Sequence, residues 1–129
     1  MKLFTTDLKN QPGELAHLCR VLAERGVNLE LSGVTAGDHG LVYFTASDED
    51  AARAALEAAK IGFEEHPALQ IKCADRAGEA AAFASKLADA NINISGLLSV
   101  SICGGEVIFA TVVDNPEEAR RLLGDQIVG

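Results

Sequence analysis

The feature that most constrains this chain is a weak internal repeat with an offset of 65 residues. Gly13-Glu14 recurs as Gly78-Glu79, and the segment 23–29 recurs as 88–94. The triplet 42–44 (Val-Tyr-Phe) falls at the same offset on 107–109 (Val-Ile-Phe). Repetition at a fixed spacing is the signature of a duplicated supersecondary unit, so the repeat predicts two similar units, residues 1–66 and 67–129.

Both units begin with the same strand and helix pattern. Apolar runs at 3–8 and 69–73 predict first strands. Helices are predicted next from apolar residues at three- and four-residue steps: Leu15, Leu18, Cys19 and Leu22 in the first unit, and Ala80, Phe83, Ala84 and Leu87 in the second. Gly26 and Asn91 follow these helices at equivalent positions, and both residue types tolerate the left-handed conformation that ends a helix.

The second half of each unit also follows one plan. Second strands begin near residues 29 and 94, and third strands are predicted at 41–46 and 107–113. Second helices are predicted to begin at Ser47 or Asp48 and at Asn115, and Asn115 suits the N-cap of its helix. Residues 62–65 can form a fourth strand in the first unit, whereas Ile127-Val128-Gly129 leaves little room for one in the second.

The expected fold class is therefore α+β, with two ferredoxin-like βαββαβ units packed together. Each unit should have an antiparallel sheet with its helices on one face. A unit of this size buries a modest core and leaves sheet edges exposed, so the units should pack on each other and the chain should form a homodimer. Residues 66–68 are the expected linker, and the last strand of the second unit is expected to be short or missing.

Composition limits the classes of partner. The net charge is −8, both halves are acidic, and no segment concentrates Lys and Arg, which argues against binding to nucleic acid or to an anionic membrane. No apolar stretch approaches the ~20 residues that cross a bilayer, and the first residues predict a strand instead of a signal peptide. We expect a cytoplasmic protein.

Cysteine, histidine and motif content argue against metals, cofactors and catalysis. Cys19, Cys73 and Cys103 are widely spaced and favour buried small side chains in a reducing compartment. The three histidines show no metal-ligand spacing. The sequence contains no GxSxG, Walker A or HExxH motif, so we expect no enzyme activity, no metal and no cofactor.

The passage from the first loop to the second strand resembles a known family. Residues 10–15 (Asn-Gln-Pro-Gly-Glu-Leu), followed by 26–29 (Gly-Val-Asn-Leu), resemble the ACT-domain pattern, in which an Asp-Arg-Pro-Gly loop opens a helix that ends in Gly-Ile-Asn-Ile. Residues 75–79 and 91–94 resemble the same pattern. Asn10 replaces the usual Asp and Ala77 the usual Pro. The resemblance covers almost the whole chain and is to small tandem-ACT proteins.

This resemblance implies a regulatory sensor. ACT domains usually bind an amino acid at an interface between two domains, and they signal to a partner enzyme or through their own dimer. The binding residues that the resemblance implies are Asn10, Gln11, Pro12, Gly13, Glu14, Leu15, Asn28 and Leu29 in the first unit, and Asp75, Arg76, Ala77, Gly78, Glu79, Asn93 and Ile94 in the second.

The chemistry of these residues suits a zwitterion. A helix start offers free N–H groups and partial positive charge to a carboxylate, and Asp75 can meet an ammonium group. Asn28 and Asn93 can both donate and accept hydrogen bonds.

Structural roles are the alternatives at each of these positions. Asn10 and Asp75 can serve only as helix caps, Asn28 and Asn93 only as turn residues, and the loop glycines only as backbone requirements. The alternative function is a protein–protein interaction module without a small-molecule ligand.

Overall fold

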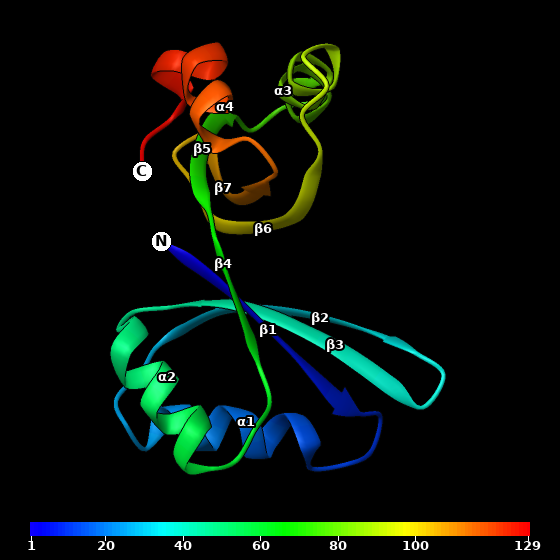
Figure 1. Ribbon diagram of the computed structural model, residues 1–129, viewed down its shortest axis with the longest axis vertical. Coiled ribbons are helices and arrows are strands. Elements are labelled where there is room, and N and C mark those ends of the chain that lie inside the picture. Colours follow the sequence, from blue (N-terminus) through cyan, green and yellow to red (C-terminus); the bar gives the residue numbers. More distant parts are fainter. The chain divides into compact units, whose positions relative to one another are not determined.

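The structure is a computed structural model that describes residues 1–129, and its internal contacts divide the chain into two compact units (Figure 1). The N-terminal unit is Lys2–His66, and the C-terminal unit is Pro67–Gly129 together with Met1. Each unit combines one β-sheet with two α-helices. The α+β fold class and its repeated βαββαβ organisation are as predicted.

The N-terminal unit has a four-stranded sheet in the order β2-β3-β1-β4. Strand β3 pairs antiparallel with both β1 and β2, and α1 and α2 cover one face of this sheet (Figure 1). Its elements are β1 (Lys2–Lys9), α1 (Glu14–Ala23), β2 (Leu29–Ala36), β3 (His39–Ala46), α2 (Glu49–Ala58) and β4 (Glu64–Pro67). The fourth strand lies two residues later than predicted, so His66 and Pro67 belong to β4 and not to a linker.

The C-terminal unit has a three-stranded sheet in the order β5-β7-β6. Its elements are β5 (Leu69–Ala74), α3 (Glu79–Asp89), β6 (Ile94–Cys103), β7 (Glu106–Val113), α4 (Pro116–Leu123) and a 3-10 turn (Gly124–Gln126). In place of a fourth strand, the Val128 N–H donates to Gln70 O and the Gln70 N–H donates to Gly129 O, each at 2.9 Å. The short last strand is therefore reduced to a brief pairing beside the start of β5.

The register of the third strands differs from the predicted one. Leu8 lies opposite Gly40 in the N-terminal sheet, and its counterpart Cys73 lies opposite Val107, so the offset between β3 and β7 is 67 residues. Strand β6 has ten residues and β2 has eight, and two irregularities in β6, between 94 and 96 and between 99 and 101, absorb the difference. The expected match of Val42 with Val107 is therefore wrong, because β-bulges shift the alignment by two positions.

Equivalent turns in the two units use the same hydrogen bonds. The Asn28 N–H donates to Ser47 Oγ and the Ser47 N–H donates to Asn28 O, both at 2.9 Å. Asn93 and Asp114 repeat this exchange at 3.0 and 3.2 Å. The left-handed residues that end α1 and α3 are Gly26 (φ 71°) and Asn91 (φ 59°), as the sequence predicts.

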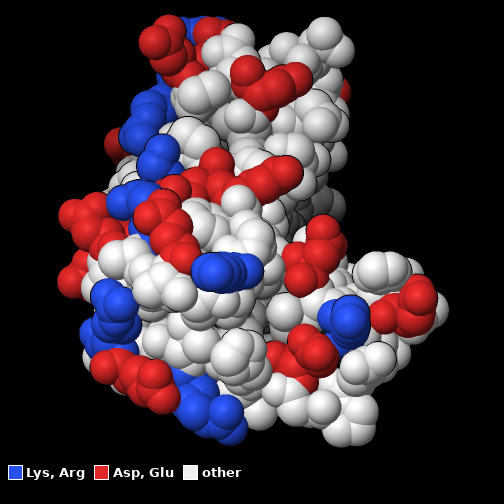
Figure 2. All heavy atoms as spheres, turned by 60° about the horizontal axis from the view of Figure 1, so that its bottom comes forward, with Lys and Arg blue, Asp and Glu red and all other residues white.

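The surface carries mixed charge. Figure 2 shows acidic and basic side chains interspersed on the face that it displays, without an area where basic side chains gather alone. No helix has both the length and the apolar character required to cross a membrane.

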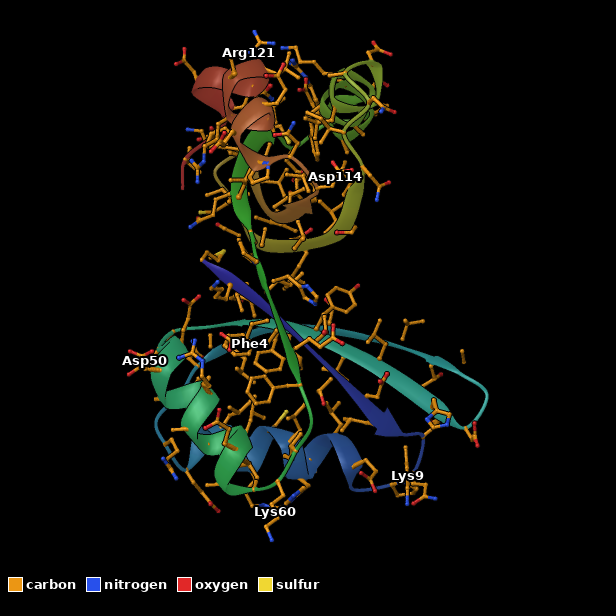
Figure 3. All side chains as sticks on the ribbon, viewed as in Figure 1. Phe4, Lys9, Asp50, Lys60, Asp114 and Arg121 are labelled. Carbon is orange, nitrogen blue, oxygen red and sulfur yellow. The ribbon has the colours of Figure 1, made fainter.

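Each unit has its own hydrophobic core. Phe4 and Phe44 stack in the N-terminal core with ring centroids 5.2 Å apart, and Figure 3 shows Phe4 between the sheet and the two helices. Phe83 and Leu87 of α3 are buried in the C-terminal core. No residue is shared by the two core clusters.

The three cysteines differ in exposure. Cys73 is buried as expected, and burial is the main cause that raises the pKa of its thiol, followed by the nearby carboxylates of Glu79 and Asp75. Cys19 is half-buried, but Cys103 is exposed. The expectation of burial is wrong for Cys103, because this residue ends β6 at the tip of a surface hairpin.

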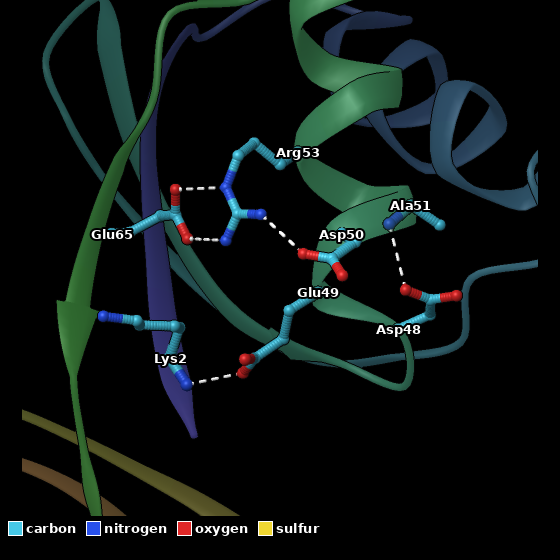
Figure 4. A network of polar contacts seen from close by, with 7 residues as sticks. All are labelled: Lys2, Asp48, Glu49, Asp50, Ala51, Arg53 and Glu65. Atoms are coloured by element: carbon cyan, nitrogen blue, oxygen red, sulfur yellow. Dashed lines mark hydrogen bonds and ion pairs between the residues drawn. The ribbon is translucent and has the colours of Figure 1, made fainter.

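A polar network joins α2 to β4 (Figure 4). Arg53 donates two hydrogen bonds to the Glu65 carboxylate, at 2.8 and 2.6 Å, and one to Asp50 at 2.8 Å. The bond to Glu65 is the main cause that raises the pKa of Arg53, and the bond from Arg53 is the main cause that lowers the pKa of Glu65.

We expect Arg53→Met to lower the melting temperature more near pH 7 than near about pH 3. Because Arg53 lowers the pKa of Glu65 in the folded state, the pair stabilises the fold above the ordinary glutamate pKa. This contribution is lost as the pH falls through the lowered value. Melting curves of both proteins across this pH range, with the exposed Arg20→Met variant as control, measure the effect. An equal loss at both ends of the range would contradict the prediction.

Candidate functional site

The loop that leads into α1 is fixed to the β2–β3 hairpin. The Asn10 N–H donates to Asp38 O at 2.8 Å, and Asn10 Nδ2 donates to Gly37 O at 3.1 Å. Gly13, with φ 90°, is the N-cap of α1, and no side chain caps this helix. The alternative in which Asn10 caps the helix is therefore wrong, and its side chain instead holds the loop against the hairpin.

A pocket of about 400 Å³ opens in the N-terminal unit beside this loop. One side is formed by the end of β1, the loop and the first turn of α1, and the other by β2 and β3. Leu31 and Gly33 lie opposite Phe44 and Val42, which belong to the core, so the pocket extends the helix-covered face of the sheet toward its edge. Its lining residues are Leu8, Lys9, Asn10, Gln11, Glu14, Leu15, Leu31, Ser32, Gly33, Val34, Thr35, Gly40 and Val42.

Two of the residues that line the pocket are strand glycines. A Cβ added at Gly40 would meet Thr35 Cγ2 at 3.6 Å, an ordinary van der Waals contact. A Cβ added at Gly33 would lie 3.3 Å from Leu41 O, which is tight. Because neither residue carries a side chain, a small molecule can approach the strands here closely.

The polar groups of the pocket carry both signs of charge. Glu14 is half-buried in the first turn of α1, and Lys9 lies exposed at the end of β1, where Figure 3 labels it. Neither side chain forms an ion pair within the chain. The N–H groups of Leu15 and Ala16 have no backbone acceptor, as is usual in a first helical turn. The pocket thus offers donors and positive charge to a carboxylate, and a free carboxylate to a cation.

Only some of the binding residues predicted for the N-terminal unit line this pocket. Asn10, Gln11, Glu14 and Leu15 line it, whereas Pro12, Gly13, Asn28 and Leu29 do not. Asn28 is bound to Ser47 in the helix-to-strand turn, and Leu29 pairs with Ala46 at the far end of β2.

Further lining residues were not predicted as binding residues from the sequence: Leu8, Lys9, residues 32–35, Gly40 and Val42. A usable signal is present in the sequence, because an isolated glycine in a strand, here Gly33, often marks a close approach of a ligand or another backbone.

The C-terminal unit repeats the loop geometry with different side chains. The Asp75 N–H donates to Gly105 O at 2.8 Å, and Gly78 (φ 92°) is the N-cap of α3 without a side-chain cap. Asp75, Arg76, Ala77 and Gly78 are exposed, and Asp75 does not cap the helix. Arg76 Nε donates to Glu79 Oε1 at 2.6 Å, so the Glu79 carboxylate in the first turn of α3 already has a cationic partner.

The other two binding residues predicted for the C-terminal unit, Asn93 and Ile94, make their contacts with the end of β7 and the residue that follows it. Asn93 exchanges hydrogen bonds with Asp114, and Ile94 pairs with Val113 at the start of β6.

A protein-family model matches residues within the C-terminal unit. Residues 68–125 match the family model of the ACT domain. No curated protein matches the chain.

Solved structures match over nearly the whole chain. Protein BT0572 from Bacteroides thetaiotaomicron has a TM-score of 0.85 at 22% identity, covering 98% of this chain and 88% of that one. The regulatory subunit of aspartate kinase from Thermus thermophilus has a TM-score of 0.68 at 19% identity, covering 97% and 90%. The corresponding subunit from Thermus flavus has a TM-score of 0.68 at 19% identity, covering 95% and 86%. The chain therefore has the fold of these proteins, and the ACT domain match lies in its C-terminal unit, at residues 68–125.

Proposed function

We propose that this chain is a regulatory sensor built from two tandem ACT units, residues 1–66 and 67–129, and that it binds an amino acid. The observation that carries the proposal is the N-terminal pocket, where the unpaired carboxylate of Glu14 lies beside free helix N–H groups and Lys9. A zwitterion needs both kinds of partner within one small cavity. The signal would pass to a partner enzyme or through a homodimer, without catalysis by this chain.

The pocket suggests which group of the ligand meets which residue. The ligand carboxylate would accept a hydrogen bond from the Leu15 N–H group, and Lys9, which also lines the pocket, would complement its charge. The ligand ammonium would pair with Glu14. The remaining lining includes Leu8, Leu31 and Val42, so an apolar ligand side chain fits this surface best.

The C-terminal match supports the regulatory reading. ACT domains are regulatory modules, and residues 68–125 match that family. The inclusion of residues 1–66 in the same class is part of this proposal, and it is supported by turns that repeat the hydrogen bonds of the C-terminal unit, including the paired contacts of Asn28 and Asn93.

Dimerisation and a cytoplasmic location belong to the same proposal. Strand β2 is an edge of its sheet, and Leu31 and Val34 on it are 37% and 63% exposed, which suits pairing with a second copy. The three cysteines are free thiols, which suits a reducing compartment. The alternative is a ligand-free interaction module that uses sheet edges or the helical face; a missing last strand in the second unit would favour it, and Val128 and Gly129 cover the start of that edge.

We expect at least one apolar amino acid to raise the melting temperature when all twenty are tested singly at about 10 mM. Ligands of this size reach roughly micromolar to millimolar affinity. At 100 times the dissociation constant, a ligand that binds only the folded state adds about 2.7 kcal/mol of stability, which corresponds to a shift of several degrees. Differential scanning fluorimetry at constant pH and ionic strength measures it, with sodium chloride and D-amino acids as controls. Unchanged melting curves with all twenty would refute the proposal.

A further inference from the structure

We infer that each chain binds one ligand, in the N-terminal unit, because the C-terminal unit fills the equivalent position with its own side chains. This inference rests on the proposed function and adds the number and the location of the ligands.

The sheet registers identify which residues correspond. Gly40 lies opposite Leu8, and Val107 lies opposite the Leu8 counterpart, Cys73. Gly33 lies opposite Val42, and Ser99 lies opposite Phe109 in the same way. The floor of the N-terminal pocket therefore corresponds to Val107, Phe109 and Ser99 in the C-terminal unit.

Larger side chains occupy these positions in the C-terminal unit. Val107 stands where the N-terminal unit has Gly40, and it is only 7% exposed within the C-terminal core. Phe109 stands where the N-terminal unit has Val42, and its ring centroid lies 5.7 Å from that of Phe83. Protein interiors are close-packed, so an isopropyl group and a phenyl ring take up volume that a ligand would need.

The charged residues around the two loops also make the C-terminal unit less suited to a zwitterion. Arg76 replaces Gln11 and pairs with Glu79, so a ligand ammonium that binds at Glu79, the counterpart of Glu14, would have to displace a cation that is already in place, and only the exposed Asp75 is left without an ion pair. Ala74 stands at the position of Lys9, so no lysine there complements a ligand carboxylate. Charge and volume both favour binding in the N-terminal unit alone.

Backbone-amide chemical-shift mapping of the whole, isotope-labelled chain tests this inference. The probe is an equimolar mixture of L-leucine, L-isoleucine, L-valine, L-methionine and L-phenylalanine. The expected result is shifts in residues 10–15 and 31–42 and none in residues 75–80 and 97–109. Shifts in both sets, or in the second set alone, would overturn the single-site inference while leaving amino-acid binding intact. An absence of shifts throughout would overturn the inference for apolar amino acids, and the melting curves with all twenty amino acids then decide the proposed function separately.

A substitution that copies the C-terminal floor into the N-terminal pocket gives a second test. Gly40→Val introduces the side chain of Val107, and its first carbon would make only ordinary van der Waals contacts. The shifts of residues 10–15 should then be lost at the same probe concentration. Val107→Ala is the matched control and should leave those shifts unchanged. A folded Gly40→Val protein with undiminished shifts would contradict the inference, and the map of the unsubstituted chain tests it even if this variant does not fold.

Discussion

Replacing Phe44 with alanine should lower the free energy of unfolding of the N-terminal unit by about 3–5 kcal/mol. Phe44 is fully buried in β3, and its ring stacks on Phe4 at 5.2 Å, so truncation removes apolar burial and leaves a cavity in the core. Tyr43 is the only tyrosine and the chain has no tryptophan, so tyrosine fluorescence reports on the N-terminal unit alone. Urea titration followed by this fluorescence measures the change.

The matched control for Phe44→Ala lies on the same strand. Leu41 is 43% exposed, so Leu41→Ala should change the free energy of unfolding by about 0.5 kcal/mol or less. A loss below about 1 kcal/mol for Phe44→Ala would be out of range for a phenylalanine core deletion. Such a result would mean that Phe44 is not central to the N-terminal core.

Local chemistry explains why much of the fold could be predicted from the sequence. Asn115 caps α4 as expected, and Asp48, one of the two predicted starts, caps α2; each accepts a hydrogen bond from the backbone N–H three residues later. Gly26 and Asn91 adopt the left-handed conformation. These features depend on one residue and its immediate neighbours, so their residue types identify them without knowledge of the tertiary structure.

The strand register of the C-terminal sheet could not be predicted from the sequence. The serines and apolar residues of 94–102 alternate as in a regular strand, yet β6 contains two irregularities that shift its pairing with β7. A bulge inserts a residue without any required side chain, so the alternation pattern does not reveal it. Because the two irregularities in β6 were not predicted, β3 was matched to β7 with an error of two residues.

The loop residues of the candidate site could be predicted from the sequence, but its strand residues could not, because they depend on strand pairing. The loop residues 10–15 form one continuous motif, whereas Gly33 and Gly40 reach the pocket only through the pairing of β2, β3 and β1. Leu15 was expected on the buried stripe of α1, but it is 48% exposed and lines the pocket. Helical periodicity identifies the face of a residue, but it does not show where the sheet ceases to cover that face.

Replacing Glu14 with glutamine should weaken amino-acid binding by about 10- to 100-fold. The substitution keeps the size of the side chain but removes its charge, and a hydrogen bond to a charged group contributes about 1.5–3 kcal/mol. Isothermal titration calorimetry with the amino acid that gives the largest rise in melting temperature measures the loss. Glu79→Gln is the matched control and should leave the affinity unchanged, because Glu79 is already paired with Arg76. Equal losses in both variants would place ligands in both units, and no loss in either would exclude Glu14 as the partner of the ligand ammonium.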